Sequence, residues 1–182
     1  MFAPAPGLRR PRTSASSNRI ARDGETEAPG VIQNKQPDKE GNAMPLEIRK
    51  SVKEMFAEAS SAIETLSVEQ AQALLGKPGI TFIDLRDPRE IWRDGGVPGA
   101  INVTRGMLEF WIDPGSPYHK DFFANGDRFV FFCAGGIRSA LATKTAQDMG
   151  LTPVCHIEGG YGAWKKAGAP VVAVEPKLAG NG

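Results

Sequence analysis

Cys133 stands directly after a short apolar run and just before two glycines and an arginine. Residues 129–132 are aromatic and aliphatic, which predicts a buried strand that ends at the cysteine. Arg138 and Ser139 follow, where a helix is predicted to begin. Glycines let a backbone curl with its N–H groups pointing inward, and a helix N-terminus adds further amides and positive partial charge. Such surroundings favour a thiolate over a thiol, and a thiolate is a strong nucleophile.

A buried cysteine beside an ordinary strand-to-helix turn is the structural alternative, because buried cysteines are common. The succession of strand, cysteine, glycines, arginine and helix favours the chemical interpretation. We therefore assign Cys133 as the nucleophile. The same loop predicts a binding site for an anionic group on its sulfur, such as a persulfide, made by Ala134, Gly135, Gly136, Ile137, Arg138 and Ser139.

The elements that must position this loop alternate between strands and helices. Apolar, β-branched runs predict strands over residues 80–85, 100–103, 129–132 and 153–157. Helical patterns cover residues 67–75, 88–93, 106–112, 138–149 and 161–167. This alternation predicts an α/β fold, with a mainly parallel sheet and helices on both faces. Ligands bind such sheets at the carboxyl ends of the strands, which is where Cys133 falls.

The first 43 residues differ in character from the rest. They are rich in Arg, Pro and Ser and have no apolar period, so we expect a disordered extension. A start codon assigned too early, with Met44 as the true start, and a transit segment are the alternatives. We expect a flexible tail over residues 175–182.

Residues 44–66 form a predicted amphipathic helical arm that precedes a domain over residues 67–174. Apolar side chains recur at three- and four-residue spacings along residues 46–63, as on one face of a helix. That face either docks on the chain's own domain or forms an interface with a partner, including a possible homodimer.

Composition restricts the partners and the compartment. The chain has 182 residues, is 41% hydrophobic and carries a formal net charge of +1, which gives no field that favours nucleic acid or a membrane surface, and we expect neither as a partner. Two Cys and two His would all be used up by a single four-ligand zinc site, so we expect no metal and no cofactor. No stretch approaches the apolar length of a transmembrane helix or a secretory signal. We expect a cytoplasmic protein, or an organellar one if residues 1–43 act as a transit segment.

Four motifs in order make the chain similar to the single-domain rhodaneses, a family of sulfurtransferases. They are Ile83-Asp84-Leu85-Arg86 followed by Glu90, Val97 to Asn102, the loop from Cys133 to Ser139, and Glu158 to Trp164. The helical arm resembles that of a bacterial subgroup. The resemblance implies a doubly wound domain over roughly residues 67–172. It also implies that Cys133 takes sulfur from a donor, becomes a persulfide and passes the sulfur on, with residues 134–139 as the persulfide-binding loop.

The activity implied is transfer of sulfane sulfur from a small donor, such as thiosulfate or another persulfide, to a thiol or cyanide acceptor. A protein acceptor is possible. The alternative from another class is a sulfur-carrier or redox-sensing module with little turnover of small molecules. A phosphatase is a third interpretation, but related phosphatases have five residues between Cys and Arg where this chain has four. The loop also lacks lysine, which leaves the donor open.

Four further residues are candidates for a supporting role. Asp84 and Arg86 leave the first predicted strand at its carboxyl end, where they either form an ion pair with a loop or with Glu90, or help to orient the active-site loop. Arg105 could steer an anionic donor. Trp111, with its neighbour Phe110, either walls the pocket or fills the core. We assign no catalytic role to His119 or His156, and we expect Cys155 to be an inert core residue.

Overall fold

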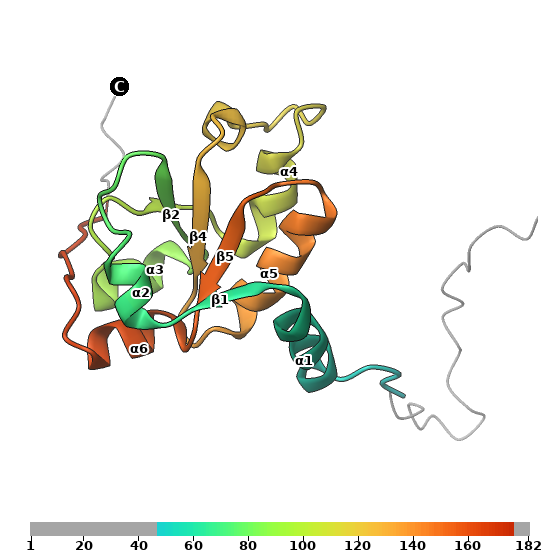
Figure 1. Cartoon of the computed structure of the whole chain (residues 1–182), viewed down its shortest axis with the longest axis horizontal. Coiled ribbons are helices and arrows are strands. Elements are labelled where there is room, and N and C mark those ends of the chain that lie inside the picture. Colours follow the sequence, from blue (N-terminus) through green and yellow to red (C-terminus); the bar gives the residue numbers. More distant parts are fainter. Residues whose placement is uncertain (1–46, 177–182) are drawn as a thin grey trace, which may run out of the picture. The chain divides into compact units, whose positions relative to one another are not determined.

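A five-stranded parallel sheet forms the centre of residues 47–176, the part of the chain that this computed structural model describes (Figure 1). The strands are β1 (Glu64–Leu66), β2 (Ile80–Asp84), β3 (Ile101–Asn102), β4 (Arg128–Phe132) and β5 (Val154–Ile157). Their order across the sheet is β1-β5-β4-β2-β3, so β4 is the central strand. This confirms the predicted α/β fold and places the four predicted strands within two residues of their expected ends.

Helices cover both faces of the sheet. They are α1 (Val52–Ala62), α2 (Val68–Gln72), α3 (Pro88–Asp94), α4 (Leu108–Ile112), α5 (Ile137–Asp148) and α6 (Gly160–Lys166), with 3-10 turns η1 (Arg105–Met107) and η2 (Asp121–Ala124). Contacts join α1, α4 and α5 on one face, whereas α2 and α6 contact β1 and β5 on the other. Figure 1 shows the arrowheads of β4 and β5 pointing down, toward the N-terminal end of α5.

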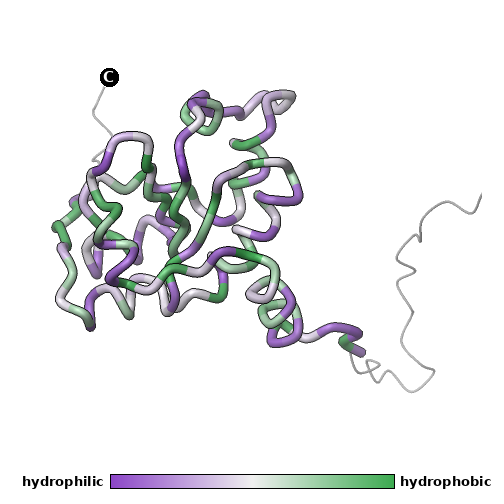
Figure 2. Tube along the Cα trace, in the orientation of Figure 1, coloured by the Kyte–Doolittle hydropathy of each residue, from purple (hydrophilic) through white to green (hydrophobic). Residues whose placement is uncertain are grey.

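Strand β4 divides the core because its side chains alternate between the two faces. Val130 and Phe132 belong to the apolar cluster under α2 and α6, and Phe129 and Phe131 belong to the cluster under α4 and α5. All four are at most 1% exposed. Figure 2 shows the apolar residues concentrated along the central strands. A central strand buried on both faces is held rigidly, and the residue that follows it has a fixed position.

The N-terminal arm differs from its prediction. The helix expected over residues 46–63 begins only at Val52, and residues 47–51 are not helical. The Ser51 hydroxyl accepts from the Glu54 amide while the Glu54 carboxylate accepts from the Ser51 amide, so a capping box fixes the start of α1. The arm also contains β1, a strand of three residues that was predicted as part of the helical arm; it pairs with β5 at the sheet edge. Three residues are too few to show a period in the sequence.

Two predictions concern residues outside the described part of the chain. The disordered extension, the alternative start and the transit segment all fall on residues 1–43, and most of the expected tail falls on residues 177–182. Among the helices of residues 47–176, none has the length and apolar character needed to cross a bilayer.

Candidate active site

Strand β4 delivers Cys133 to the carboxyl edge of the sheet. The Leu85 amide donates to the Phe132 carbonyl at 2.9 Å, so the strand ladder continues to the last residue before the cysteine. Cys133 continues the alternation of the strand and joins the cluster under α5. The cysteine is 1% exposed. Its sulfur is therefore held in a defined direction and shielded from bulk water.

The loop after Cys133 places one backbone amide against the sulfur. The Gly136 N–H donates to the Cys133 Sγ at 3.2 Å. Gly136 has φ +94° and is the N-cap residue of α5, whose first-turn amides have no acceptor within the helix. Ala134, Gly135 and Ile137 are exposed, so the loop opens to solvent on that side. The arrangement suits a negatively charged sulfur, or a second sulfur attached to it.

The first residues of α6 hold this loop through backbone hydrogen bonds. The Tyr161 amide donates to the Cys133 carbonyl at 2.7 Å, and the Gly162 amide donates to the Ala134 carbonyl at 2.9 Å. A Cβ atom on Gly160 would lie only 2.3 Å from the Cys133 oxygen. The Gly159-Gly160 pair therefore permits the backbone at the start of α6 to approach the backbone of Cys133 closely. The sequence shows the glycine pair before a helix, but it does not indicate that this segment contacts Cys133.

Arg138 lies at the rim of the loop and is held by Glu90 of α3. Its two terminal nitrogens donate to the Glu90 carboxylate at 2.8 and 2.9 Å. The hydrogen bonds to Glu90 raise the pKa of Arg138, with smaller contributions from burial in the opposite direction and from Cys133. The same pairing lowers the pKa of Glu90. Glu90 is thus the partner of Arg138, and the alternative in which it forms an ion pair with Arg86 is not observed.

Asp84 and Arg86 pair with each other behind the loop. The Arg86 Nη2 lies 2.6 Å from the Asp84 Oδ2 and also donates to the Gly95 carbonyl at 2.9 Å. Its guanidinium stacks 3.7 Å above the centre of the Tyr161 ring. The two residues are at most 2% exposed. Arg86 contacts Tyr161, whose amide holds Cys133, and this contact fits a positioning role for the pair.

A second hydrogen-bonded chain supports the loop from inside the sheet. The Ser139 hydroxyl donates to the Gly136 carbonyl at 3.0 Å and lies 3.4 Å from the His156 Nδ1. The His156 Nε2 lies 3.0 Å from the Thr65 hydroxyl of β1. Burial lowers the pKa of His156, which favours the neutral ring. Nothing in the sequence indicated a role for His156 in the site, because its contact with Thr65 depends on the pairing of β5 with the short strand β1.

The two remaining candidates make their described contacts outside the cysteine loop. Arg105 forms an ion pair with Glu109 at 2.7 Å and lines a cavity between α1 and α5. Trp111 packs edge-on against Phe122, with ring centres 6.4 Å apart. It adjoins the apolar cluster under α4 and α5. Its packing matches the core-filling alternative.

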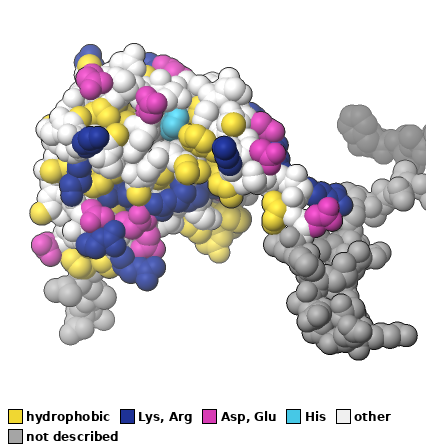
Figure 3. Space-filling view, turned by 90° about the horizontal axis from the view of Figure 1, so that it is seen from below, with side chains coloured by type: hydrophobic (Ala, Val, Ile, Leu, Met, Phe, Trp, Pro, Cys, Tyr) yellow, Lys and Arg dark blue, Asp and Glu magenta, His cyan; other side chains and the backbone are white. Residues whose placement is uncertain are grey.

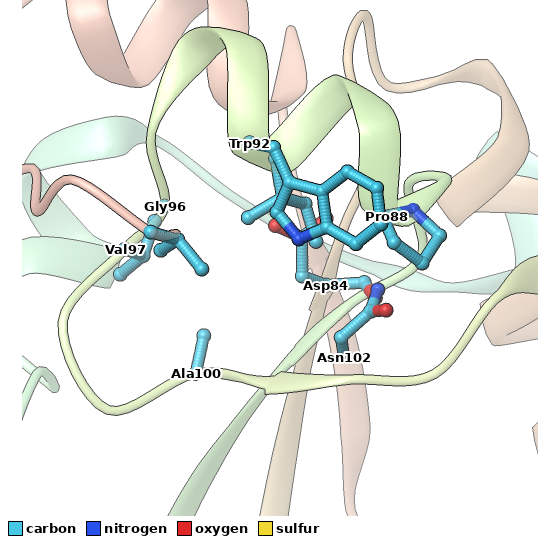
Figure 4. A pocket seen from close by; sticks show the side chains of 9 residues that line it. Asp84, Pro88, Trp92, Gly96, Val97, Ala100 and Asn102 are labelled. Atoms are coloured by element: carbon cyan, nitrogen blue, oxygen red, sulfur yellow. The ribbon is translucent and has the colours of Figure 1, made fainter. Parts of the chain in front are cut away.

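A separate cavity of about 140 Å³ lies beside α3. Trp92 and Pro88 of α3 face Ala100 and Asn102 across it, with Asp84 on its inner wall (Figure 4). Cys133 is not among the residues that line it. Within residues 47–176, no three His, Cys, Asp or Glu side chains come close enough together to hold a metal ion.

The fold and the loop together define a class of protein: a doubly wound α/β domain with an amide-cradled cysteine after its central strand. Comparison with known families gives the class its name. The model of the rhodanese-like domain matches residues 67–167, and the chain belongs to this family. The resemblance stated from the sequence is confirmed.

Individual relatives carry different names. A chloroplastic thiosulfate sulfurtransferase of Arabidopsis thaliana is 35% identical over 122 residues, which cover 65% of this chain and all of that protein. A tRNA uridine(34) hydroxylase of Mesorhizobium japonicum is 31% identical over 56% of this chain, but the match spans only 32% of the hydroxylase. A solved structure from Rhodopseudomonas palustris is 58% identical with a TM-score of 0.70, covering 71% of this chain and 100% of that one. It is described as a protein of unknown function and possible tyrosine phosphatase.

Proposed function

We propose that the chain is a sulfurtransferase that carries sulfane sulfur as a persulfide on Cys133. The observation that carries the proposal is the Gly136 N–H at 3.2 Å from a sulfur that is itself 1% exposed. A preorganised donor aimed at a buried sulfur is worth more than the same donor would be in water, because the site excludes solvent. The sulfurtransferase names among the relatives support the same reaction class.

The reaction exchanges one sulfur bond for another in each half. With thiosulfate, the Cys133 thiolate attacks the outer sulfur and a new sulfur–sulfur bond forms. The original sulfur–sulfur bond breaks, and its electron pair leaves with sulfite. A thiolate or cyanide acceptor then attacks the outer sulfur of the persulfide and releases the Cys133 thiolate. No external oxidant or reductant is needed, and a shared covalent intermediate gives ping-pong kinetics.

The loop residues have separate tasks in this scheme. The amides of Gly136 and of the first turn of α5 donate to the charged outer sulfur. Arg138 adds a full positive charge at the rim, in an orientation that Glu90 fixes through two hydrogen bonds. Ser139 holds the Gly136 carbonyl, so that the Gly136 amide keeps its direction.

Intact-protein mass spectrometry after incubation with thiosulfate tests the proposal. We expect wild type to gain one sulfur atom, which cyanide then removes, and Cys133→Ala to gain none. Cys155→Ala is the matched control, since it also loses one buried thiol. A gain that persists in Cys133→Ala contradicts the proposal. If wild type gains no sulfur from thiosulfate or from a persulfide donor, the redox-sensing or carrier alternative is favoured instead.

The phosphatase alternative can be tested with the same two cysteine variants, because one relative is described as a possible tyrosine phosphatase. Four residues between Cys133 and Arg138 make a tight ring that suits a sulfur-sized anion better than a phosphate. Hydrolysis of an aryl phosphate that disappears in Cys133→Ala and persists in Cys155→Ala establishes the phosphatase. We expect no such hydrolysis.

The acceptor and compartment complete the proposal. A thiol is the acceptor that a reducing compartment provides, and both cysteines are free thiols here. We place the reaction in the cytoplasm, with an organelle as the alternative if residues 1–43 act as a transit segment. A homodimer through α1 is a further proposal, which sedimentation of the full chain tests.

A further inference from the structure

The hydrogen-bonded chain behind the cysteine loop runs from strand β1 to the sulfur. The His156 ring lies between two hydroxyls, with Thr65 at 3.0 Å from its Nε2 and Ser139 at 3.4 Å from its Nδ1. Ser139 donates to the Gly136 carbonyl at 3.0 Å, and the Gly136 amide donates to the Cys133 Sγ at 3.2 Å. His156 and Ser139 are at most 3% exposed. Polar groups buried to this degree need hydrogen-bond partners, so these contacts hold both ring nitrogens.

The direction of each hydrogen bond follows from the single proton of the Ser139 hydroxyl. The Gly136 carbonyl can only accept, so this proton lies between the two residues and the Ser139 oxygen accepts from His156. The Nδ1 of His156 therefore carries the ring proton. Burial lowers the pKa of His156, which favours a neutral ring whose Nε2 accepts from the Thr65 hydroxyl. Each group in the chain thus donates toward the loop, and hydrogen bonds aligned in this way strengthen one another.

Gly136 is the point at which this chain can affect the sulfur. Its φ of +94° is open to glycine, which has no Cβ to restrict the backbone. The direction of its amide therefore depends on the contacts around it. Its carbonyl accepts from the Ala140 amide at 2.9 Å and from the Ser139 hydroxyl at 3.0 Å. A Ser139 hydroxyl that His156 holds in place keeps this residue, and the amide that donates to Cys133, in one orientation.

The outer end of the chain comes from the N-terminal arm. The family model matches residues 67–167, so Thr65 lies outside the family domain. Thr65 is the direct partner of His156 in the pairing of β1 with β5, and paired residues carry their side chains on the same face of a sheet. Thr65 itself is exposed. A substitution there therefore changes the hydrogen bond to the ring with little effect on packing.

A sulfur donor approaches from a different side. Figure 3 views the molecule from below Figure 1, toward the end at which β4 and β5 terminate, and Lys and Arg side chains lie there among hydrophobic ones. Ile137 is 46% exposed and the Arg138 side chain is 41% exposed, so both are accessible to a donor. His156 is not accessible in this way. A change at His156 should therefore alter the orientation of the loop and leave the contacts of the donor unchanged.

We infer that His156 is a positioning residue for sulfur transfer, and that Thr65 sets the ring tautomer in which it acts. The inference rests on the proposed function. His156 contacts neither the sulfur nor the donor, and it acts through Ser139 and Gly136 on the amide that faces the sulfur. The arm thereby completes the active site of the family domain with one hydroxyl.

The ring tautomer is tested in the full wild-type chain by nuclear magnetic resonance. The sequence has two histidines, so long-range proton–nitrogen spectra with labelled histidine contain two rings, and His119→Gln identifies each of them. We expect a neutral His156 ring with its proton on Nδ1. In Thr65→Val the Nε2 loses its donor, and we expect a mixture of the two tautomers. A wild-type ring with its proton on Nε2, or a charged ring at neutral pH, overturns the inference.

Two amide substitutions at His156 then separate its two hydrogen bonds. The side-chain amide of His156→Asn reaches the place of Nδ1 and can still donate to Ser139, whereas that of His156→Gln reaches the place of Nε2. Both variants replace a buried ring by a smaller polar group, so each is the matched control of the other in urea unfolding. The readout is single-turnover loading of Cys133 from thiosulfate, followed by intact mass. It separates the maximal rate from the half-saturating donor concentration.

We expect His156→Gln to lower the maximal rate about tenfold at an unchanged half-saturating concentration, because the amide at the sulfur is displaced while the rim stays intact. His156→Asn should retain most of the wild-type rate. Equal losses in the two variants, or wild-type rates in both, overturn the inference although wild type still loads sulfur. If wild type gains no sulfur, the proposed function fails, and the tautomer alone decides the inference.

Thr65→Val provides the same test if the His156 variants do not fold, since it changes an exposed side chain. We expect a smaller loss of the maximal rate, again at an unchanged half-saturating concentration. An unchanged rate in this variant, together with an unchanged tautomer, would show that the arm does not act on the loop.

Discussion

The two cysteines occupy neighbouring strands of the sheet and are equally buried, yet their surroundings are opposite. Cys133 directly follows β4, and its sulfur accepts from the Gly136 amide at 3.2 Å. Cys155 lies inside β5, opposite Val130, and its thiol donates to the Phe129 carbonyl at 3.5 Å. The Cys133 sulfur accepts from a backbone amide, whereas the Cys155 thiol donates to a backbone carbonyl and has only the more distant Arg128 Nη2 as a donor.

This difference shows that burial alone does not make a cysteine inert. A hydrogen bond donated to a sulfur favours its anionic form in general, whereas burial raises the pKa of Cys155. Arg128 approaches Cys155 at 3.9 Å and only partly offsets that effect, since it is also paired with Glu64. Position along the strand decides which environment a cysteine meets, because free amides occur at the strand end and not within the ladder.

The largest expected effect comes from a substitution that displaces the backbone of Cys133. In Gly160→Ala the new methyl would overlap the Cys133 carbonyl, 2.3 Å away, at a residue with φ +57°. We expect a loss of about 2–5 kcal/mol in the free energy of unfolding, from overpacking and left-handed strain together. Sulfur transfer should fall by about a hundredfold or more, because small displacements of a catalytic group are costly.

Gly135→Ala is the matched control for this variant. A Cβ on Gly135 meets nothing within 4 Å, and the residue lies in the same loop. We expect near-normal stability in urea unfolding and near-normal thiosulfate turnover. Equal losses in the two variants would show that any change in the loop is harmful and that contact with α6 is not the cause.

Alkylation of the native protein gives the second test, by comparing the two thiols directly. We expect iodoacetamide to label Cys133 at least tenfold faster than Cys155, since the thiolate is the reacting species and the pKa of Cys155 is raised. Peptide mass mapping over time measures both rates in one sample. Labelling in denaturant should make the rates similar, and a faster Cys155 in the native protein would contradict the comparison.

The loop is where the sequence predicted the structure best. Strand, cysteine, glycines and helix are adjacent in the chain, so their local geometry follows from residue types alone. Strands β2 to β5 and the helices around them were predicted for the same reason, because their apolar patterns are local. The family match over residues 67–167 confirms the class of protein that those motifs indicated.

The supports of the loop could not be predicted because they come from distant segments. Glu90 lies 48 residues before Arg138, and His156 lies 17 residues after Ser139. Each pair forms only when the strands take their order in the sheet, and local sequence patterns do not predict that order. The position of α1 shows the same limit: an apolar face identifies a helix but not the helix α5 on which it packs.

Two hydroxyls on α5 give the third test, at the level of single hydrogen bonds. Ser139 and Thr143 lie one turn apart and are fully buried, but only Ser139 has a partner for its hydroxyl among the described residues. We expect Ser139→Ala to lower the free energy of unfolding by about 1–3 kcal/mol and to slow sulfur transfer several-fold. Thr143→Val should be neutral or stabilising in the same urea titration. A reversed order would show that the Gly136 carbonyl needs no support.

The smallest effect is expected at the rim, where Arg138 is 41% exposed and Glu90 is 24% exposed. Glu90→Gln can still accept from the Asp87 amide at the start of α3, so the variant removes the charge and retains the cap. At neutral pH we expect a loss of at most about 1 kcal/mol and a few-fold slower transfer, because the pair is partly screened by solvent. Glu109→Gln, which breaks a similar pair away from the loop, should affect stability alone.

The pH dependence of this variant separates the charge from the side-chain shape. Pairing with Arg138 lowers the pKa of Glu90 below the 4.5 of the free side chain. A carboxyl whose pKa is lowered on folding stabilises the protein fully above the unfolded value and loses that contribution as the pH falls through the folded value. The stability gap between wild type and Glu90→Gln should therefore be constant above about pH 5 and close below pH 4.5. A stability difference that persists below pH 4.5 would mean that Glu90 supports the loop through packing. The charge of Glu90 at the rim would then not be the cause of its effect.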